Sequence, residues 1–302
     1  MNNINGILNI LKPPNMTSHD IVSLVRKKLK VKKVGHTGTL DPMAAGVLPI
    51  CIGKATKIVE YLQKDTKVYR AELSLGIVTD TQDRWGNILS ENTVDILEDD
   101  IVNTINSFRG EIEQTPPMYS AIKHKGKKLY ELAREGITIK RDTRKVIIYS
   151  IDIVNIKNNK VLFDVKCSKG TYIRTLCHDI GQTLGCGGHM SFLIRKASGV
   201  FKLKDSITIE ELNRLEIDEI KSSYLLGIDY PLNHIPSVDV DPSALKYVLN
   251  GVPLRAHNYK IRSENIKDND IVRLYTNHKF IALGLYENLG NRSIIKVKKL
   301  LS

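Results

Sequence analysis

The sequence lacks any long hydrophobic run. Its longest apolar stretch, residues 44–53, is too short to span a membrane and contains Pro49. The first fifteen residues also lack the charged start and the small-residue cleavage site of a signal peptide. Only 4 of the 302 residues are cysteines, and they form no Cys-x-x-Cys pair. These absences predict a cytoplasmic protein with reduced thiols and no membrane association.

Motifs for common cofactors and metals are missing as well. Residues 46–56, GVLPICIGKAT, resemble a phosphate-binding loop, but six residues separate the two glycines and Ala55 replaces the Ser or Thr. Residues 185–190, GCGGHM, lack the third glycine of a dinucleotide fingerprint. The Cys and His residues between 177 and 189 fit no common zinc spacing, and a helix with a buried turn explains them better. We therefore predict no cofactor and no metal.

Acidic residues are in the minority. The chain has 33 Asp and Glu against 45 Lys and Arg, which gives a net charge of +12. Six of the eight residues in 26–33 are basic, and residues 123–145 contain nine Lys and Arg. Such runs are often simply solvated, but the overall charge favours a polyanionic partner, above all a nucleic acid. We interpret 123–145 as an exposed basic insertion.

The hydrophobic pattern predicts an α+β fold. Alternating apolar residues indicate strands at 68–75 and 161–167, and residues 6–11 and 47–52 are typical of buried strands. Helical spacing predicts helices near 17–29, 56–63, 94–108, 176–184 and 209–215. Because these elements do not alternate regularly, we expect a mixed, largely antiparallel sheet flanked by helices.

Chain length alone allows one large domain with a small one, or two domains of middling size. Residues 229–242, DYPLNHIPSVDVDP, have the Pro and Asp content of an inter-domain linker. Short strands separated by turn signals follow this segment. We predict a catalytic domain over 1–233 and a small β-rich module over 234–302.

A glycine-rich loop holds an isolated acid, Asp41, within residues 34–58, VGHTGTLDPMAAGVLPICIGKATKI. Glycines at 35, 38 and 46 allow close approach of the backbone to a ligand or positive φ angles. An Asp before a Pro is either a turn-forming residue or a reactive group. The loop by itself leaves both alternatives open.

The surroundings of Asp41 resemble a known family. Residues 35–57 resemble the signature of the TruB-type tRNA pseudouridine synthases, which isomerise uridine 55 in the T-loop. The resemblance spans about residues 5–200 in family order, through the blocks GILNILKPPNMTSHD, KVYRAELSLGIVTDTQDRWG, FRGEIEQTPPMYSAIKHKGKKLYELAREG and CSKGTYIRTLCHDIGQTLGCGGHMSFLIR. One residue departs from the pattern, because Asn15 stands where the family usually has glycine. Asn accepts a positive φ better than most residues.

The resemblance implies a pseudouridine synthase fold with a PUA-like C-terminal module, and it implies that Asp41 is the catalytic residue. The carboxylate would either attack C1′ of the ribose or remove a proton from C2′. Both roles require an ionised acid, and a neighbouring cation stabilises that form. Arg174 matches the family arginine that pairs with this aspartate. Tyr69 matches the tyrosine on which the target base stacks, although its place on an apolar strand face also suits plain core packing.

The resemblance also implies supporting residues. Tyr172 and Leu193 match positions that line the uracil pocket, with simple packing as the alternative. Lys12 matches a lysine near the active-site loop. His36 matches the residue that helps to extrude the target nucleotide from the RNA.

The expected partner is the T stem-loop of tRNA, and we expect a monomer with no obligate protein partner. Two rival functions remain. One is a tRNA-binding folding chaperone that needs no catalysis. The other is a guide-RNA-dependent pseudouridine synthase, although such chains usually carry longer basic extensions, whereas this sequence ends at Ser302 soon after the small module.

Overall fold

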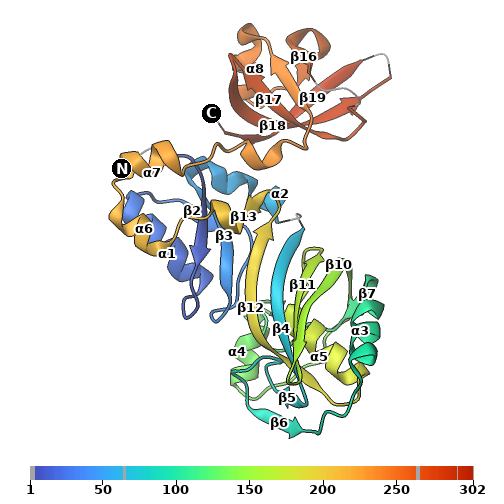
Figure 1. Cartoon of the computed structure of the whole chain (residues 1–302). Coiled ribbons are helices and arrows are strands. Elements are labelled where there is room, and N and C mark those ends of the chain that lie inside the picture. Colours follow the sequence, from blue (N-terminus) through green and yellow to red (C-terminus); the bar gives the residue numbers. More distant parts are fainter. Residues whose placement is uncertain (1–3, 64–65, 263–265, 291, 302) are drawn as a thin grey trace.

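A computed structural model of the chain describes residues 4–63, 66–262, 266–290 and 292–301. Helices and strands intermix around two main sheets, and Figure 1 shows the smaller sheet at one end of the molecule. The predicted α+β class, with a mixed and largely antiparallel sheet and a β-rich C-terminal module, is confirmed. No helix in these described ranges is both long and apolar enough to cross a membrane.

The large sheet is built from strands that lie between residues 6 and 202. In spatial order its strands are β1 (Gly6–Lys12), β3 (Ala45–Ile52), β12 (Gly188–Ser198), β4 (Lys67–Leu75), β11 (Lys160–Cys167), β10 (Arg144–Lys157) and β7 (Gly110–Gln114). Two short strands extend it, β2 (Val34–His36) beside β3 and β13 (Phe201–Lys202) beside β12. The β12–β3 pair is parallel, whereas the other pairs of this sheet are antiparallel.

Alternation along the strands builds the core as predicted. Leu73 on β4 and Phe163 on β11 are fully buried on the same side of the sheet, whereas their neighbours Glu72 and Asp164 remain partly exposed. Fully burying a side chain of this size contributes about 1.5–3 kcal/mol to folding.

The helix α1 (Ser18–Leu29) packs its apolar face on this core. Thr17 caps it through a capping box with Asp20, and the helix ends where Lys30 takes a left-handed conformation. The other predicted helices are α3 (Glu98–Ser107), α5 (Ile173–Thr183) and α6 (Ile209–Arg214), followed by α7 (Ile217–Ser223). The helix predicted over 56–63 is confirmed in part: α2 covers Val59–Leu62, whereas the 3₁₀ helix Gly53–Ile58 covers residues 56–58.

The basic segment 123–145 has a small core of its own. It contains the short strands β8 (Lys123–His124) and β9 (Lys127–Lys128) and the helix α4 (Leu129–Arg134). Leu129 and Leu132 are buried against Met118 in a separate apolar cluster. Most of the segment is exposed, as predicted, and only the apolar face of the amphipathic helix α4 is buried.

The C-terminal module is a second sheet with one short helix, α8 (Leu245–Leu249). Its strand order is β15 (Leu254–Arg255), β19 (Ser293–Leu300), β18 (Lys279–Asn288), β17 (Ile271–Thr276), β14 (Ser237–Val240) and β16 (Tyr259–Ile261). Because β14 lies within 229–242, that segment is not a linker throughout. Leu283 and Leu301 of the module pack with Ile7 and Val47 of the large sheet in a shared apolar cluster. The boundary at residue 233 stays a prediction.

Candidate active site

Asp41 lies on the loop between β2 and β3, and this loop is fixed at several points. The backbone N–H of Leu40 donates a hydrogen bond to Ser18 Oγ at 2.9 Å, and the Ser18 hydroxyl donates to the Leu40 carbonyl at 3.2 Å. The N–H of Ala44 donates to the Asp41 carbonyl at 3.1 Å. A short loop with these internal bonds holds the Asp41 side chain in one place.

Lys12 fixes the same loop from below. Its side chain is fully buried, and Nζ donates to the carbonyls of Pro13 at 2.9 Å, Met16 at 2.6 Å and Pro42 at 3.0 Å. Burial lowers the pKa of Lys12 to about 8, while the negative charge of Asp41 opposes this shift. Lys12, the lysine predicted near the active-site loop, thus holds the backbone next to Asp41 through hydrogen bonds to carbonyl groups.

The turn at 13–15 that Lys12 holds also contains the residue that departs from the family pattern. Asn15 adopts φ 65°. A left-handed turn is therefore present although the usual glycine is not, as expected for Asn.

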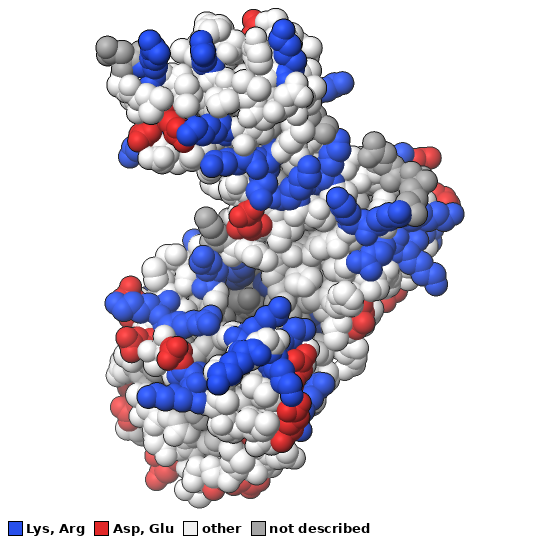
Figure 2. Space-filling view, turned by 180° about the vertical axis from the view of Figure 1, so that it is seen from behind, with Lys and Arg blue, Asp and Glu red and all other residues white. Residues whose placement is uncertain are grey.

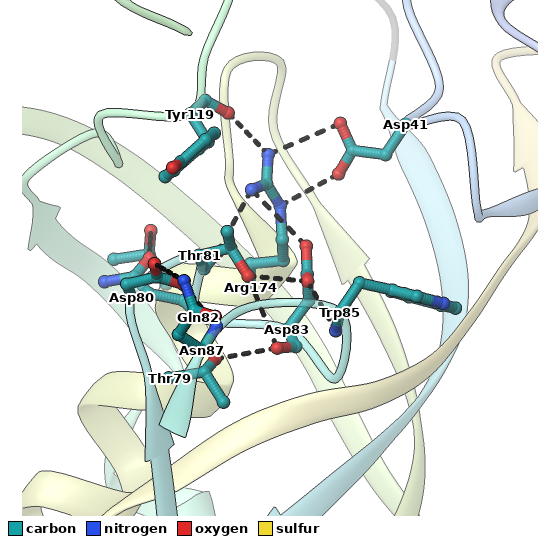
Figure 3. A network of polar contacts seen from close by, with 11 residues as sticks. Asp41, Thr79, Asp80, Thr81, Gln82, Asp83, Trp85, Asn87, Tyr119 and Arg174 are labelled. Carbon is teal, nitrogen blue, oxygen red and sulfur yellow. Dashed lines mark hydrogen bonds and ion pairs between the residues drawn. The ribbon is translucent and has the colours of Figure 1, made fainter. Parts of the chain in front are cut away.

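Arg174 meets Asp41 in a two-point ion pair, shown in Figure 3. Its Nε lies 2.9 Å from Asp41 Oδ2, and its Nη2 lies 3.4 Å from Asp41 Oδ1. Nη2 also donates to the Tyr119 carbonyl at 2.9 Å, and Nη1 donates to the Thr81 carbonyl at 3.1 Å. The Arg174 side chain is only 6% exposed, whereas that of Asp41 is 39% exposed. A buried guanidinium therefore orients a carboxylate that solvent, and hence a ligand, can reach.

A second acid, Asp83, completes this network. Asp83 lies in the turn between β5 (Ile77–Thr79) and β6 (Ile88–Glu91), and its Oδ2 is 3.6 Å from Arg174 Nη1. Its Oδ1 accepts hydrogen bonds from the Thr81 hydroxyl at 2.7 Å and from the Trp85 N–H at 3.1 Å. Sequence reasoning did not single out this acid. The one sequence feature that could have indicated Asp83 is its position in the family-like block KVYRAELSLGIVTDTQDRWG.

Arg195 on β12 is the other functional residue that sequence reasoning missed. Its side chain is almost fully buried, and Nε donates to the Val47 carbonyl at 2.7 Å. Nη2 donates to the Gly38 carbonyl at 3.0 Å, and Nη1 lies 3.4 Å from the Thr39 carbonyl. Arg195 therefore anchors the part of the loop that precedes Asp41. The block SFLIRK contains it, but nothing in the pattern indicates that this arginine is buried.

Tyr69 lies on β4, and Leu193 lies on the neighbouring strand β12, which also carries Arg195. Tyr69 on β4 is paired in register with Arg195, and its half-buried ring packs against the main core. Burial raises the pKa of the Tyr69 hydroxyl, and the charge of Arg195 opposes this shift. Leu193 is buried and pairs with Ala71. Tyr69, predicted to stack on the target base, thus lies opposite Arg195, and Leu193, predicted to line the uracil pocket, lies on the same strand as Arg195.

Tyr172 and His36 lie close in sequence to the two residues of the ion pair, Tyr172 before Arg174 and His36 before Asp41. Tyr172 is the N-cap of α5, two residues before Arg174, and Gln114 bonds to its backbone at both N–H and carbonyl. Burial raises the pKa of its hydroxyl. His36 lies on β2, and its Nδ1 is buried without a hydrogen-bond partner among the residues that the structure describes. Burial, reinforced by Arg195, lowers the pKa of His36, so that the imidazole is neutral at pH 7.

The distribution of charged side chains indicates which kinds of ligand the surface can bind. Figure 2 shows Lys and Arg side chains gathered around the concave middle of one face, between the C-terminal module and the opposite end. Within the described parts of the chain, no group of three His, Cys, Asp or Glu side chains could hold a metal ion. The four cysteines are buried and free.

The same fold is found in solved structures of other proteins. Two solved structures share the fold over 98% of this chain. One is a Cbf5-Nop10-Gar1 complex, with a TM-score of 0.77, 31% identity and 85% of that chain covered. The other is an H/ACA RNP bound to a substrate RNA containing 2′-deoxyuridine, with a TM-score of 0.75, 29% identity and 85% of that chain covered.

Sequence comparison places the chain more narrowly. The model of the TruB family pseudouridylate synthase N-terminal domain matches residues 26–173, and that of the tRNA pseudouridylate synthase B C-terminal domain matches 174–235. The chain is 56% identical to the tRNA pseudouridine synthase B of Alkaliphilus oremlandii, with 99% of each chain covered. It is 48% identical to that of Clostridioides difficile, with 98% of this chain and 99% of the relative covered. The chain belongs to the TruB family of pseudouridylate synthases, and it is an isomerase.

Proposed function

We propose that this protein converts uridine 55 in the T-loop of tRNA to pseudouridine, as a stand-alone monomeric enzyme of the cytoplasm. The relatives named tRNA pseudouridine synthase B match it over their full length, and its net charge of +12 suits a polyanionic substrate. The observation that carries the proposal is the half-exposed Asp41 carboxylate held at two points by a buried Arg174.

The reaction breaks two bonds, N1–C1′ and C5–H, and forms two, C5–C1′ and N1–H. The N1–C1′ bond of the uridine breaks, the uracil turns, and C5 bonds to C1′. The proton on C5 leaves, and N1 gains a proton, so that atoms and electrons balance with no outside reagent. Uracil is both leaving group and nucleophile, which is why no cofactor is expected.

Asp41 is the group placed to act on the ribose. It either attacks C1′ directly or removes a proton from C2′, and both routes use the ionised carboxylate. Arg174 orients that carboxylate, because its Nε lies 2.9 Å from Oδ2 and its Nη2 lies 3.4 Å from Oδ1. The bonds from Arg174 to two backbone carbonyls keep the guanidinium in place when a substrate enters.

The neighbouring residues receive the base. We assign Tyr69 to stacking on the uracil, and Tyr172 and Leu193 to lining its pocket. His36 would fill the space that the extruded nucleotide leaves in the RNA. Extruding a stacked base costs a few kcal/mol, which such contacts offset.

The remaining surface binds the RNA. We assign the basic segment 123–145 to contacts with phosphates, and residues 234–302 to an RNA-binding, PUA-like module separate from a catalytic domain over 1–233. Folded RNA is recognised largely through its shape and its unpaired loop bases, which suits a T stem-loop.

An Asp41→Ala variant tests the proposal. Purified protein is incubated with an unmodified T-arm hairpin, and pseudouridine is mapped by carbodiimide primer extension. We expect modification at position 55 by the parent protein, none by Asp41→Ala, and RNA binding within about threefold of the parent, because the carboxylate is not needed for binding. Asp218→Ala, which removes an almost fully exposed acid on α7, is the matched control and should keep full activity.

The same assay separates the rival functions. Normal modification by Asp41→Ala would refute the catalytic assignment. A folding chaperone would bind the hairpin without forming pseudouridine, and a guide-dependent synthase would modify nothing until a guide RNA is added.

A further inference from the structure

The chain has a single tryptophan, and it is exposed beside the active site. Trp85 is 45% exposed, although indole rings are usually well buried. Its backbone N–H donates to Asp83, which in turn pairs with Arg174. Figure 3 shows the Trp85 ring directed away from this network, on the same side of Arg174 as Asp41. The ring is therefore exposed to solvent, and its backbone is linked through Asp83 and Arg174 to Asp41.

The turn that carries Trp85 is rigid. Asp80 bonds to Asn87 across it: the Asp80 N–H donates to the Asn87 carbonyl at 3.1 Å, and the Asn87 N–H donates to Asp80 Oδ1 at 2.9 Å. The N–H of Gly86 donates to the Asp83 carbonyl at 3.3 Å, and a Cβ at Gly86 would lie 2.3 Å from side-chain oxygens of Asp80 and Thr81. A preorganised aromatic ring loses little conformational entropy when it binds a partner.

The charge next to Trp85 is also available. The Arg84 guanidinium lies 5.2 Å from the centroid of the Trp85 ring, and it forms no ion pair within the described residues. The nearby acids already have cationic partners, because Asp83 pairs with Arg174 and Glu72 pairs with Lys160 at 3.0 Å. The exposed Trp85 ring, with the Arg84 guanidinium over it, suits a ligand that combines a flat base with phosphates.

We propose that Trp85 and Arg84 form a stacking platform for an unpaired base of the RNA substrate other than the target uridine. The proposal rests on the function proposed above and deepens it. Base stacking on an aromatic side chain is sequence-tolerant, and the adjacent Arg84 would contact the backbone of the same nucleotide. The platform would help to hold the opened loop while the target uridine is at Asp41.

The lone tryptophan gives a direct readout. The full chain with Asp41→Asn, which prevents turnover, is titrated with an unmodified T-arm hairpin, and tryptophan fluorescence is followed beside the anisotropy of a labelled hairpin. We expect fluorescence quenching that saturates together with the anisotropy. A fully paired RNA duplex of the same length should bind without comparable quenching, because it offers no free base.

Variants of the otherwise active enzyme supply a second readout. We expect Trp85→Leu to raise Kd and KM for the hairpin about 5- to 100-fold with kcat nearly unchanged, and Trp85→Phe to stay within about threefold of the parent. Arg84→Gln should weaken binding and reduce its dependence on salt. Circular dichroism should be unchanged, since Trp85 contributes little to the core.

Three results would overturn the platform: no quenching at saturation, equal quenching by the duplex, or a normal KM for Trp85→Leu. In each case, continued formation of pseudouridine by the parent would leave the proposed function intact. If the parent formed no pseudouridine but the hairpin still quenched Trp85, the proposed function would fail and the platform would stand.

Discussion

Arg195 offers the sharpest test of how the catalytic loop is held in place. The change is Arg195→Met, which keeps an unbranched side chain of similar length and removes the guanidinium. In the parent that group is almost fully buried and donates to the carbonyls of Val47 and Gly38 at 2.7 and 3.0 Å, with Thr39 at 3.4 Å as a weaker third contact.

The expected cost follows from those carbonyls. A buried acceptor left without a donor costs about 1–3 kcal/mol, so the two short bonds predict a loss of about 2–6 kcal/mol in the free energy of unfolding. Relief from burying a charge offsets part of this, which places the expected value near 3 kcal/mol. Because the freed loop carries Asp41, a displacement of about 1 Å would also lower kcat roughly 100-fold.

Urea denaturation and kcat on the T-arm hairpin measure the two effects. Arg195→Lys serves as the control, since one ammonium replaces only part of the fork and should recover part of both losses. A loss below about 1 kcal/mol together with a kcat equal to that of the parent would refute the view that Arg195 holds the loop.

Two further predictions concern the same loop. The folded-state pKa of Lys12 is about 8, below its ordinary value of 10.5, so the unfolded chain keeps this proton to higher pH. Below pH 8, burial of the charged lysine therefore lowers the free energy of unfolding. This unfavourable contribution should shrink by roughly 2 kcal/mol between pH 7.5 and 9.5. Urea unfolding at both pH values should show this gain relative to Lys12→Met, and equal pH dependence of the two proteins would contradict it. Gly46→Ala should destabilise the protein by at least about 2 kcal/mol in the same assay, because Gly46 has φ 121° and a Cβ would lie 2.3 Å from the Arg195 carbonyl oxygen. A neutral effect would mean that β3 and β12 can separate there without cost.

Local patterns predicted much of the fold. The alternation in 68–75 and 161–167 gave β4 and β11, and the cap at Thr17 with apolar residues one helical turn apart gave α1. The pattern was only partly right at 56–63, where residues 56–58 are 3₁₀ helix and α2 begins at Val59, and it failed at 229–242, where a Pro- and Asp-rich segment contains a strand. In both places tertiary packing outweighs weak local preference.

The residues of the candidate site also fall into two groups, those that the sequence indicated and those that it did not. Asp41, Arg174 and Tyr69 stood out through the motifs in which they lie, and the structure brings Asp41 and Arg174 into contact across 133 positions of sequence. Asp83 and Arg195 did not stand out, since an acid in a turn and an arginine in a strand are normally solvated.

The sequence by itself determined the periodicity of the strands and helices, the caps that begin and end them, and the loop that displays Asp41. These features depend on residues a few positions apart, so a single stretch of chain contains the information. Tertiary structure alone decided that Lys12 and Arg195 are buried and bond to loop carbonyls. A charged side chain is buried only where several distant segments supply enough acceptors to compensate its lost hydration, and that condition is met only after β1, β3 and β12 have assembled.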